Sequence, residues 1–344
     1  MKKLVLIILV VGLVLGGFSG TPAAKMTIKF GHVAPPFHGQ SIGIDAFAKY
    51  VNEKTNGEIV VQTFPMGQLG SERSMAEQVQ MGTLEMASIT TAVMQNYVPQ
   101  AAVLDLPFIW PSRKVAYAVL DDPAFQEKYF SYLPAKGFIG IGWTENEFRD
   151  FNNTKRPVHT PEDMKGLKVR VINSPIYMDT FKALGTSPVG IPFPELYNSL
   201  QQGVIDAQEN PLYTSILIKA TEVAKYVTKT QHSLTECIQI VNPDFWNRLT
   251  PAQQKIFRDG AKLAIKVNRE STAAAFNKLP KLGISIADYC KQNNVQVVYL
   301  TDAERQAFRA AVHPVLEKYR NVVGADLYDY LMATIEKHQK ALGQ

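Results

Sequence analysis

The sequence has 344 residues, roughly the length of two domains. It is 46% hydrophobic and 19% charged, with 22 Gly and 20 Pro, which is typical of a folded globular protein and excludes disordered, collagen-like and polytopic membrane chains. A formal charge of +5 is too small a surplus to indicate nucleic-acid binding, and two cysteines exclude a disulfide scaffold or a zinc site of four thiolates.

The N-terminal region has the three-part layout of a secretory signal peptide. Two lysines precede an apolar stretch over residues 4–15, and small residues follow as far as Ala24. The apolar stretch falls short of the roughly 20 residues that a membrane-spanning helix needs. We therefore predict that residues 1–24 are a cleaved signal peptide and that the mature protein is exported.

Strand-like and helix-like segments alternate in the next region, as in α/β proteins. A strand at 27–31, a helix at 42–55 and a strand at 58–64 indicate a parallel crossover unit. Beyond Thr250 the pattern is mostly helical, with capping-box starts at Thr250 and Thr301. An α/β fold places ligands at the carboxyl ends of its strands. The other expected elements are a helix at 72–81, strands at 85–89, 138–143 and 167–171, a helix ending at Gly185, a helix at 195–202 and a strand at 204–207.

Catalytic and cofactor motifs are missing from the sequence. It has no G-x-S-x-G, no H-E-x-x-H, no Walker A loop and no C-x-x-C, and its six histidines lie at no metal-ligand spacing. His32 and His38 are still candidate ligand contacts because they follow the first strand. We expect no metal and no cofactor. Export would permit a disulfide between Cys237 and Cys290, and two separate buried thiols are the alternative.

The strand at 167–171 carries an unexpected pair of cations. Leu167, Val169 and Val171 share one face, so Lys168 and Arg170 share the other. A buried parallel strand should be apolar on both faces, so cations there need anions or water. Arg170 is therefore either a ligand contact or a solvated residue on an exposed edge strand.

Two further segments are dense in groups that either pack or bind. Arg149 follows the strand at 138–143, and the alternative to a binding role is a surface ion pair with a nearby carboxylate. In the segment 191–211, Phe193 and Tyr197 could do either, and Asn210 is held extended by Pro211 at a strand's end. Core positions are expected at Leu196, Leu200 and Val204.

These stretches carry a family resemblance. The sequence resembles the periplasmic solute-binding subunits of tripartite ATP-independent periplasmic (TRAP) transporters, the DctP family or extracellular solute-binding protein family 7. The segment Gln-Gly-Val-Ile-Asp-Ala-Gln-Glu-Asn-Pro at 202–211 is the most specific match. The other matching segments, in order, are 30–35 (Phe-Gly-His-Val-Ala-Pro), 64–73, 79–87, 163–171 and 193–197.

The resemblance implies roles for single residues. Arg170 would grip a ligand carboxylate, with Arg149 and Asn210 contacting the same group. Phe193 would pack on the ligand. Glu72 would meet ligand hydroxyl groups from the opposite domain. By position alone, weaker candidates are Trp143, Tyr213, Tyr197 and His32.

The resemblance also implies the architecture and the function. We expect a two-lobed periplasmic binding protein fold with a ligand cleft between the domains and more than one chain crossover. Domain I would comprise 25–147 plus 236–275, and domain II would comprise 148–235 plus 276–344. The protein would capture an organic acid in the periplasm and deliver it to the small and large membrane subunits of a TRAP transporter, without being membrane-embedded itself.

Alternatives to this function are an exported ligand-binding sensor and a carboxylic-acid lyase or hydrolase that uses Glu72 with Arg170. The acid itself stays open among dicarboxylates, 2-oxo acids, sugar acids and aromatic acids. Glu72 and the histidines favour a hydroxylated acid.

Overall fold

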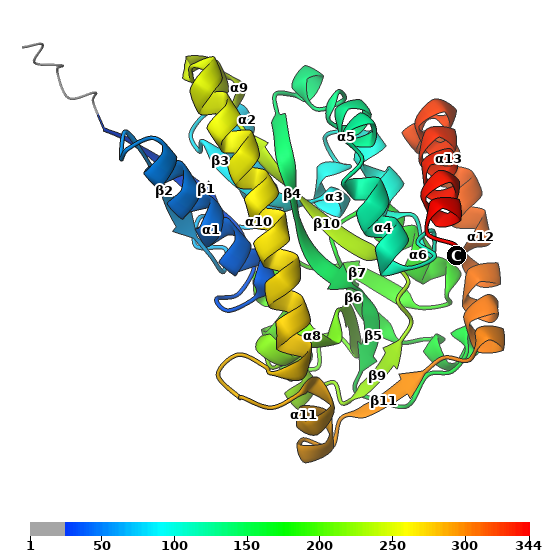
Figure 1. Cartoon of the computed structure of the whole chain (residues 1–344). Coiled ribbons are helices and arrows are strands. Elements are labelled where there is room, and N and C mark those ends of the chain that lie inside the picture. The colour runs from blue at the N-terminus through cyan, green and yellow to red at the C-terminus, as the bar shows by residue number, and fades with distance from the viewer. Residues whose placement is uncertain (1–24) are drawn as a thin grey trace, which may run out of the picture.

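The computed structural model describes residues 25–344, and the expected signal peptide lies outside them. Figure 1 shows two sheets with helices packed around them. None of the helices in residues 25–344 is long and apolar enough to span a membrane.

The first sheet has the strand order β2-β1-β3-β10-β4. β1 is parallel to β2 and to β3, whereas β10 runs antiparallel to β3 and β4. The parallel β1–α1–β2 unit confirms the crossover that the sequence predicts. The elements of this part are β1 (Met26–Gly31), α1 (Gly39–Lys54), β2 (Ile59–Phe64), α2 (Glu72–Met81), β3 (Met86–Thr90), α3 (Thr91–Met94), the 3-10 helix η1 (Pro99–Asp105), α4 (Arg113–Leu120), α5 (Pro123–Phe130), β4 (Ile139–Phe148), β10 (Leu234–Val241), α9 (Pro243–Arg248) and α10 (Pro251–Asn277).

The second sheet has the strand order β11-β9-β5-β8-β6-β7. β6 lies between β8 and β7, and the side chain of Arg170 on β6 is buried. The alternative of an exposed edge strand with a solvated arginine is therefore wrong. The elements of this part are β5 (Asp150–Asn153), β6 (Lys168–Val171), α6 (Pro175–Ala183), β7 (Ser187–Gly190), the 3-10 helix η4 (Phe193–Glu195), α7 (Leu196–Gln201), β8 (Ala207–Asn210), α8 (Leu212–Leu217), β9 (Tyr226–Lys229), α11 (Ile286–Gln292), β11 (Gln296–Tyr299), α12 (Asp302–Val323) and α13 (Ala325–Ala341).

The chain passes between the sheets more than once, which confirms the predicted α/β fold. β4 leads into β5 across Arg149, and β9 leads back into β10 across 230–233. α10 packs along α1 and β4 (Figure 1). α12 contacts α6 and η1, whereas α13 contacts α4 and α5, so the last helix packs on helices that flank the first sheet. The division into two domains at the stated residues stays a prediction.

The two long C-terminal helices begin as the sequence predicts. Thr250 accepts a hydrogen bond from the backbone of Gln253, whose side chain accepts one from the backbone of Thr250. Thr301 and Glu304 form the same reciprocal pair. Each box satisfies backbone N–H groups that have no partner in the first helical turn.

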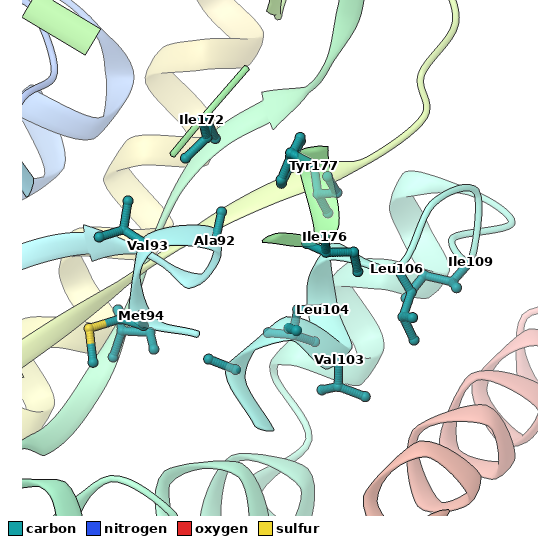
Figure 2. Packing of buried hydrophobic residues seen from close by; sticks show 14 of the residues in the cluster. Ala92, Val93, Met94, Val103, Leu104, Leu106, Ile109, Ile172, Ile176 and Tyr177 are labelled. Atoms are coloured by element: carbon teal, nitrogen blue, oxygen red, sulfur yellow. The ribbon is translucent and has the colours of Figure 1, made fainter. Parts of the chain in front are cut away.

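The largest apolar cluster joins elements of both sheets. Figure 2 shows part of this cluster, in which Met94 of α3 and Leu104 of η1 belong with Ile176 and Tyr177 of α6. Leu196 and Leu200 are buried as expected, but the prediction for Val204 is wrong because this residue is exposed in the turn before β8.

Candidate functional site

A cavity of about 400 Å³, counted with the solvent at its mouth, lies between the two sheets. The first sheet and its helices supply Val33, Ala34, Pro35, Gln40, Glu72, Thr90 and Cys237. The second sheet and its helices supply Arg170, Ile172, Phe193, Asn210 and Thr214. Asn146 lies near the end of β4, and Arg149 is the one residue between β4 and β5.

Strand ends place several of these polar groups. Thr90 is the last residue of β3 and Asn210 the last residue of β8, and Ile172 directly follows β6. A cavity at the carboxyl ends of strands is the usual ligand position in α/β proteins. Pro211 follows Asn210 and prevents β8 from continuing as a ladder strand.

Arg170 is a buried cation whose guanidinium is only partly satisfied. Its side chain is 2% exposed, and its Nε donates to the carbonyl oxygen of Ile191 at 2.8 Å. Its Nη1 lies 4.0 Å from Oε1 of Glu209 and has no hydrogen-bond partner among residues 25–344. Burial lowers the pKa of Arg170 to about 10, although the carboxylate of Glu209 acts in the opposite direction. The group is therefore still charged at neutral pH and has hydrogen-bonding capacity left.

Arg149 is held differently, by a carboxylate of the protein itself. Its Nε and Nη2 both contact the side chain of Glu209, with Nη2 3.0 Å from Oε1. Nη2 also donates to Oδ1 of Asn210 at 3.0 Å, and Nη1 donates to the hydroxyl of Thr235 at 3.1 Å. The alternative of a surface ion pair is wrong, since both partners of this pair are fully buried.

Glu209 is a buried carboxylate beside the cavity that the sequence did not single out. Burial alone would raise its pKa, but Arg149, followed by contacts from His232, holds the pKa below its usual value. Its Oε1 also accepts from the backbone N–H of Ile172 at 3.3 Å. Two guanidinium groups thus share one carboxylate, so this charged cluster carries an excess of one positive charge.

Glu72 faces this cluster from the first sheet. It is the first residue of α2, and its Oε1 accepts from the backbone N–H of Thr90 at 2.7 Å. Burial raises its pKa, against the opposing effect of that hydrogen bond and of the two arginines. This carboxyl group therefore takes up a proton more readily than an exposed glutamate does.

The structure brings five of the sequence-predicted site residues to one cavity, and their contact with a ligand stays a prediction. These five residues are Arg170, Arg149, Asn210, Phe193 and Glu72. Asn210 already uses its amide within the protein, because its Nδ2 donates to Gln208 at 2.6 Å.

The weaker candidates do not line the cavity. Trp143 packs against Tyr129 and Phe130 in the core, and its indole N–H donates to the carbonyl of Leu120. Strand alternation explains this position, because the neighbouring Thr144 faces Gln40 and Trp143 faces the other side.

Tyr213 and His38 stack on each other next to the cavity, and His32 is a second buried histidine near His38. The ring of Tyr213 stacks on His38, and its hydroxyl donates to the carbonyl of Phe37 at 3.0 Å. Burial lowers the pKa of His32 to about 4 and that of His38 to about 3, so both rings are neutral at pH 7. Tyr197 lies on α7, with its hydroxyl 3.5 Å from the side-chain nitrogen of Gln201.

Neutral polar groups complete the lining, and sequence reasoning missed them. Gln40 donates to Ser88 and Thr144 at 3.1 Å each, and Thr214 donates to Oδ1 of Asn146 at 2.8 Å. Thr90 could have been found, since it directly follows the predicted strand at 85–89. Asn146 could not have been found, because β4 continues to Phe148 whereas the predicted strand ends at residue 143.

The two cysteines are separate. Cys237 lines the cavity and Cys290 lies in the cluster around α11, and both are free thiols. Within residues 25–344, no group of three or more His, Cys, Asp or Glu side chains is arranged to hold a metal ion.

Comparisons with known proteins agree with this architecture. The model of bacterial extracellular solute-binding protein family 7, DctP, matches residues 30–321. A solute-binding protein of Verminephrobacter eiseniae is 34% identical over 308 residues, which cover 88% of each chain.

Solved structures are similar over nearly the whole chain. The sugar acid binding protein of Advenella mimigardefordensis in complex with galactonate superposes with a TM-score of 0.84 at 28% identity, covering 92% of this chain and 99% of that one. A TRAP periplasmic solute-binding protein of a Polaromonas species bound to D-erythronate gives a TM-score of 0.83 at 31% identity, covering 90% and 99%.

Fold and cavity together define the class of protein, a solute-binding protein with a cavity between its two sheets. The chain belongs to the DctP family of TRAP periplasmic solute-binding proteins, extracellular solute-binding protein family 7. This is a family of transport proteins rather than enzymes, and the lyase or hydrolase alternative is set aside.

Proposed function

We propose that the protein captures an organic acid by its carboxylate, with Arg170 as the main contact, and delivers it to TRAP membrane subunits. The observation that supports this function is the buried Nη1 of Arg170, which lines the cavity and has no hydrogen-bond partner among residues 25–344. Arg149 and Asn210 sit beside it and hold the local geometry.

A carboxylate is the ligand group that this arrangement favours. A guanidinium offers parallel N–H donors that match the two oxygens of a carboxylate, and lysine cannot reproduce that geometry. In a recessed cavity such a contact is strong because little water competes for it. Removal of the arginine would weaken binding by about 2 to 5 kcal/mol, or roughly 30-fold to several-thousand-fold.

The charges favour an acid with one carboxylate. Glu209 already neutralises one of the two guanidinium groups, so a single negative charge on the ligand balances the cluster. A second ligand carboxylate would meet Glu72 and Gln40 on the side of the first sheet, and neither residue is a cation. Desolvating an unmatched charge there is costly.

The remaining polar groups favour hydroxyl groups on that acid. Glu72, Gln40, Asn146 and Thr214 offer carboxyl, amide and hydroxyl groups that can pair with alcohols. Galactonate and D-erythronate, the ligands of the two similar structures, combine one carboxylate with several hydroxyl groups. We therefore propose a hydroxylated monocarboxylic acid, such as a sugar acid, as the solute.

The export and delivery steps rest on the family and on residues 1–24. We infer that this segment directs the chain to the periplasm and is removed there. The membrane subunits of a TRAP transporter would then accept the solute from the closed form of the protein, as in the family to which it belongs.

A thermal-shift screen against organic acids tests the proposal. A bound acid at about 100 times its dissociation constant adds about 2.7 kcal/mol to the free energy of unfolding. We expect sugar acids to raise the melting temperature, C4 dicarboxylates to raise it less, and the corresponding neutral sugars to leave it unchanged.

Arg170→Lys is the matching variant, with Lys168→Gln as its control on the same strand. We expect Arg170→Lys to abolish most of the ligand-induced shift and to leave the melting temperature of the free protein nearly unchanged. Lys168 is exposed, so its variant should respond to the acid like the parent protein. An undiminished shift in Arg170→Lys would remove this arginine from the site.

A further inference from the structure

A second cavity, which shares no lining residue with the first, lies beside the two connections between the sheets, at Phe148 and Gln231. Its empty space is about 640 Å³, again counted with solvent at its mouth. Arg113 begins α4, Phe148 ends β4, and Arg305 and Arg309 lie on α12. Trp110 and Gln231 come from the segments before α4 and before β10.

The walls of this cavity carry three guanidinium groups, and only one of them has a carboxylate partner. Arg113 pairs with Glu147 and lies 3.4 Å from Glu145. Arg305 donates to the carbonyl oxygen of Thr230 at 2.7 Å. Among residues 25–344, no carboxylate lies within 4.0 Å of Arg305 or of Arg309. Two positive charges therefore face one recess with no neutralising group in contact.

Two N–H donors at this cavity also lack an acceptor. Trp110 is 6% exposed, and its indole N–H has no hydrogen-bond partner among residues 25–344. The same holds for the buried Nε of Arg309. Buried donors are normally paired, and each exception calls for a ligand, a water or an ion.

The two arginines of α12 also influence each other. The pKa of Arg305 is lowered, mainly by burial and next by the positive charge of Arg309. Asp302 and Asp150 act in the opposite direction without contacting Arg305. An anion between the two guanidinium groups would relieve this repulsion.

We propose that this cavity is a second anion site, which binds a doubly charged oxyanion of the phosphate type. Such an ion matches the two cations in charge and offers three acceptor oxygens to the N–H donors of Arg309 and Trp110. A single carboxylate would leave one cation without a counter-charge. The site is independent of the proposed organic-acid function, because none of its residues lines the first cavity.

Calorimetric titration of the purified, acid-free protein with inorganic phosphate tests the proposal. Sodium chloride keeps the ionic strength constant, so that screening does not change during the titration. We expect saturable binding with one phosphate per chain, and much weaker binding of acetate. Glycerol phosphate in a parallel titration distinguishes a free phosphate from the phosphoryl group of a larger molecule, according to which of the two binds more tightly.

Three variants locate the phosphate. Arg309→Gln should weaken its binding by about tenfold or more, as expected for the loss of a charge-assisted hydrogen bond. Arg305→Gln should weaken it similarly. Arg320→Gln is the control on the same helix, since Arg320 is paired with Asp329 and does not line the cavity, and it should bind like the parent protein.

A further variant tests whether phosphate binds in the first cavity instead of the second. Arg170→Lys should bind phosphate like the parent protein, although we expect it to lose the organic acid. Phosphate binding lost in Arg170→Lys, unchanged in both α12 variants, absent from the parent protein, or matched by acetate would overturn the second site.

Discussion

Glu209 supplies the carboxylate that offsets the positive charges of Arg149 and Arg170 at the first cavity. It contacts Arg149 directly and lies 4.0 Å from Arg170, and all three side chains are buried. Burying a charge without a counter-charge is far more costly than burying a pair. The free protein therefore depends on Glu209 before any ligand arrives.

Glu209→Gln should destabilise the ligand-free protein because two buried cations would lose their counter-charge. We expect the free energy of unfolding to fall by about 3 kcal/mol in urea denaturation. Glu77→Gln is the control, because Glu77 pairs with Arg73 at 3.1 Å on the surface, and its loss should cost about 0.5 kcal/mol or less. Equal effects of the two variants would contradict the role given to Glu209.

The buried side chain of Asp105 makes the stability of the protein depend on pH. Burial raises its pKa to about 7, against the opposing hydrogen bonds of Thr91 and Tyr177. Between its ordinary value and about pH 7 the unfolded chain has lost this proton while the folded protein keeps it. The unfolded state then binds fewer protons, so this group lowers stability as pH rises through that window.

Asp105→Asn removes this titration and retains an acceptor for Tyr177. We expect the variant to gain about 2 kcal/mol in free energy of unfolding relative to the parent protein between pH 5 and pH 8. Urea denaturation at both pH values measures this difference. A difference that is the same at pH 5 and pH 8 would show that Asp105 has an ordinary pKa.

At the scale of elements, α1 and α10 approach each other through glycines. A Cβ atom on Gly43 would lie 2.5 Å from the carbonyl oxygen of Ala264, and one on Gly39 would lie 2.7 Å from that of Asn268. Backbone atoms cannot move aside as a flexible side chain can. α1 begins beside the first cavity and carries Gln40, so this contact also helps to position the lining.

Gly43→Ala should force the two helices apart and lower the free energy of unfolding by about 2 kcal/mol. Lys49→Ala, on the exposed side of α1, is the control and should change stability by less than about 0.5 kcal/mol. Thermal or urea unfolding of both variants measures the effect. A neutral Gly43→Ala would show that the helices can separate without cost.

How far the sequence predicts an element depends on what stabilises it. α2 spans 72–81, the residues predicted, because Ser71 caps its start and Gly82 adopts a left-handed φ of 77° at its end. β8 was expected at 204–207 but lies at 207–210, where Gln208, Glu209 and Asn210 are buried polar residues. Hydrophobic periodicity does not reveal a buried strand whose side chains are polar and paired by ion pairs or hydrogen bonds.

The same reasoning explains what the sequence predicts of the site. The matching segments contain Arg170 and Asn210, and Arg149 follows a predicted strand; all three residues line one cavity. The direction in which Trp143 points depends on the register of β4, which contains irregular pairings with β10. Glu209 pairs with Arg149 because it lies on β8. Since the sequence did not predict the position of β8, it could not identify Glu209 as this partner.

At the scale of the whole molecule, the cavity receives groups from both sheets, so a ligand can hold the two lobes together. Glu72 and Gln40 contribute from one side, and Arg170 and Phe193 from the other. Contacts made to both lobes at once favour the closed arrangement over an open one. The connections at 149 and 230–233 are the segments across which such a motion would occur.

Small-angle X-ray scattering should detect this motion. We expect a bound sugar acid to reduce the radius of gyration of the parent protein, and the same acid to leave Arg170→Lys unchanged. Calorimetry on the same samples establishes that the acid is bound. Binding by the parent protein with no change in dimensions would show that its lobes do not close on the ligand.

The charged and the neutral parts of the cavity wall are anchored separately. Arg149, Arg170 and Glu209 hold one another, whereas Gln40 is tied to Ser88 and Thr144, and Thr214 to Asn146. Under the proposed function, substitutions among these amides and hydroxyls would change which acid binds and leave the contacts of the two arginines unchanged. Ligand specificity could therefore change, by natural or designed substitution, without changes to Arg149, Arg170 or Glu209.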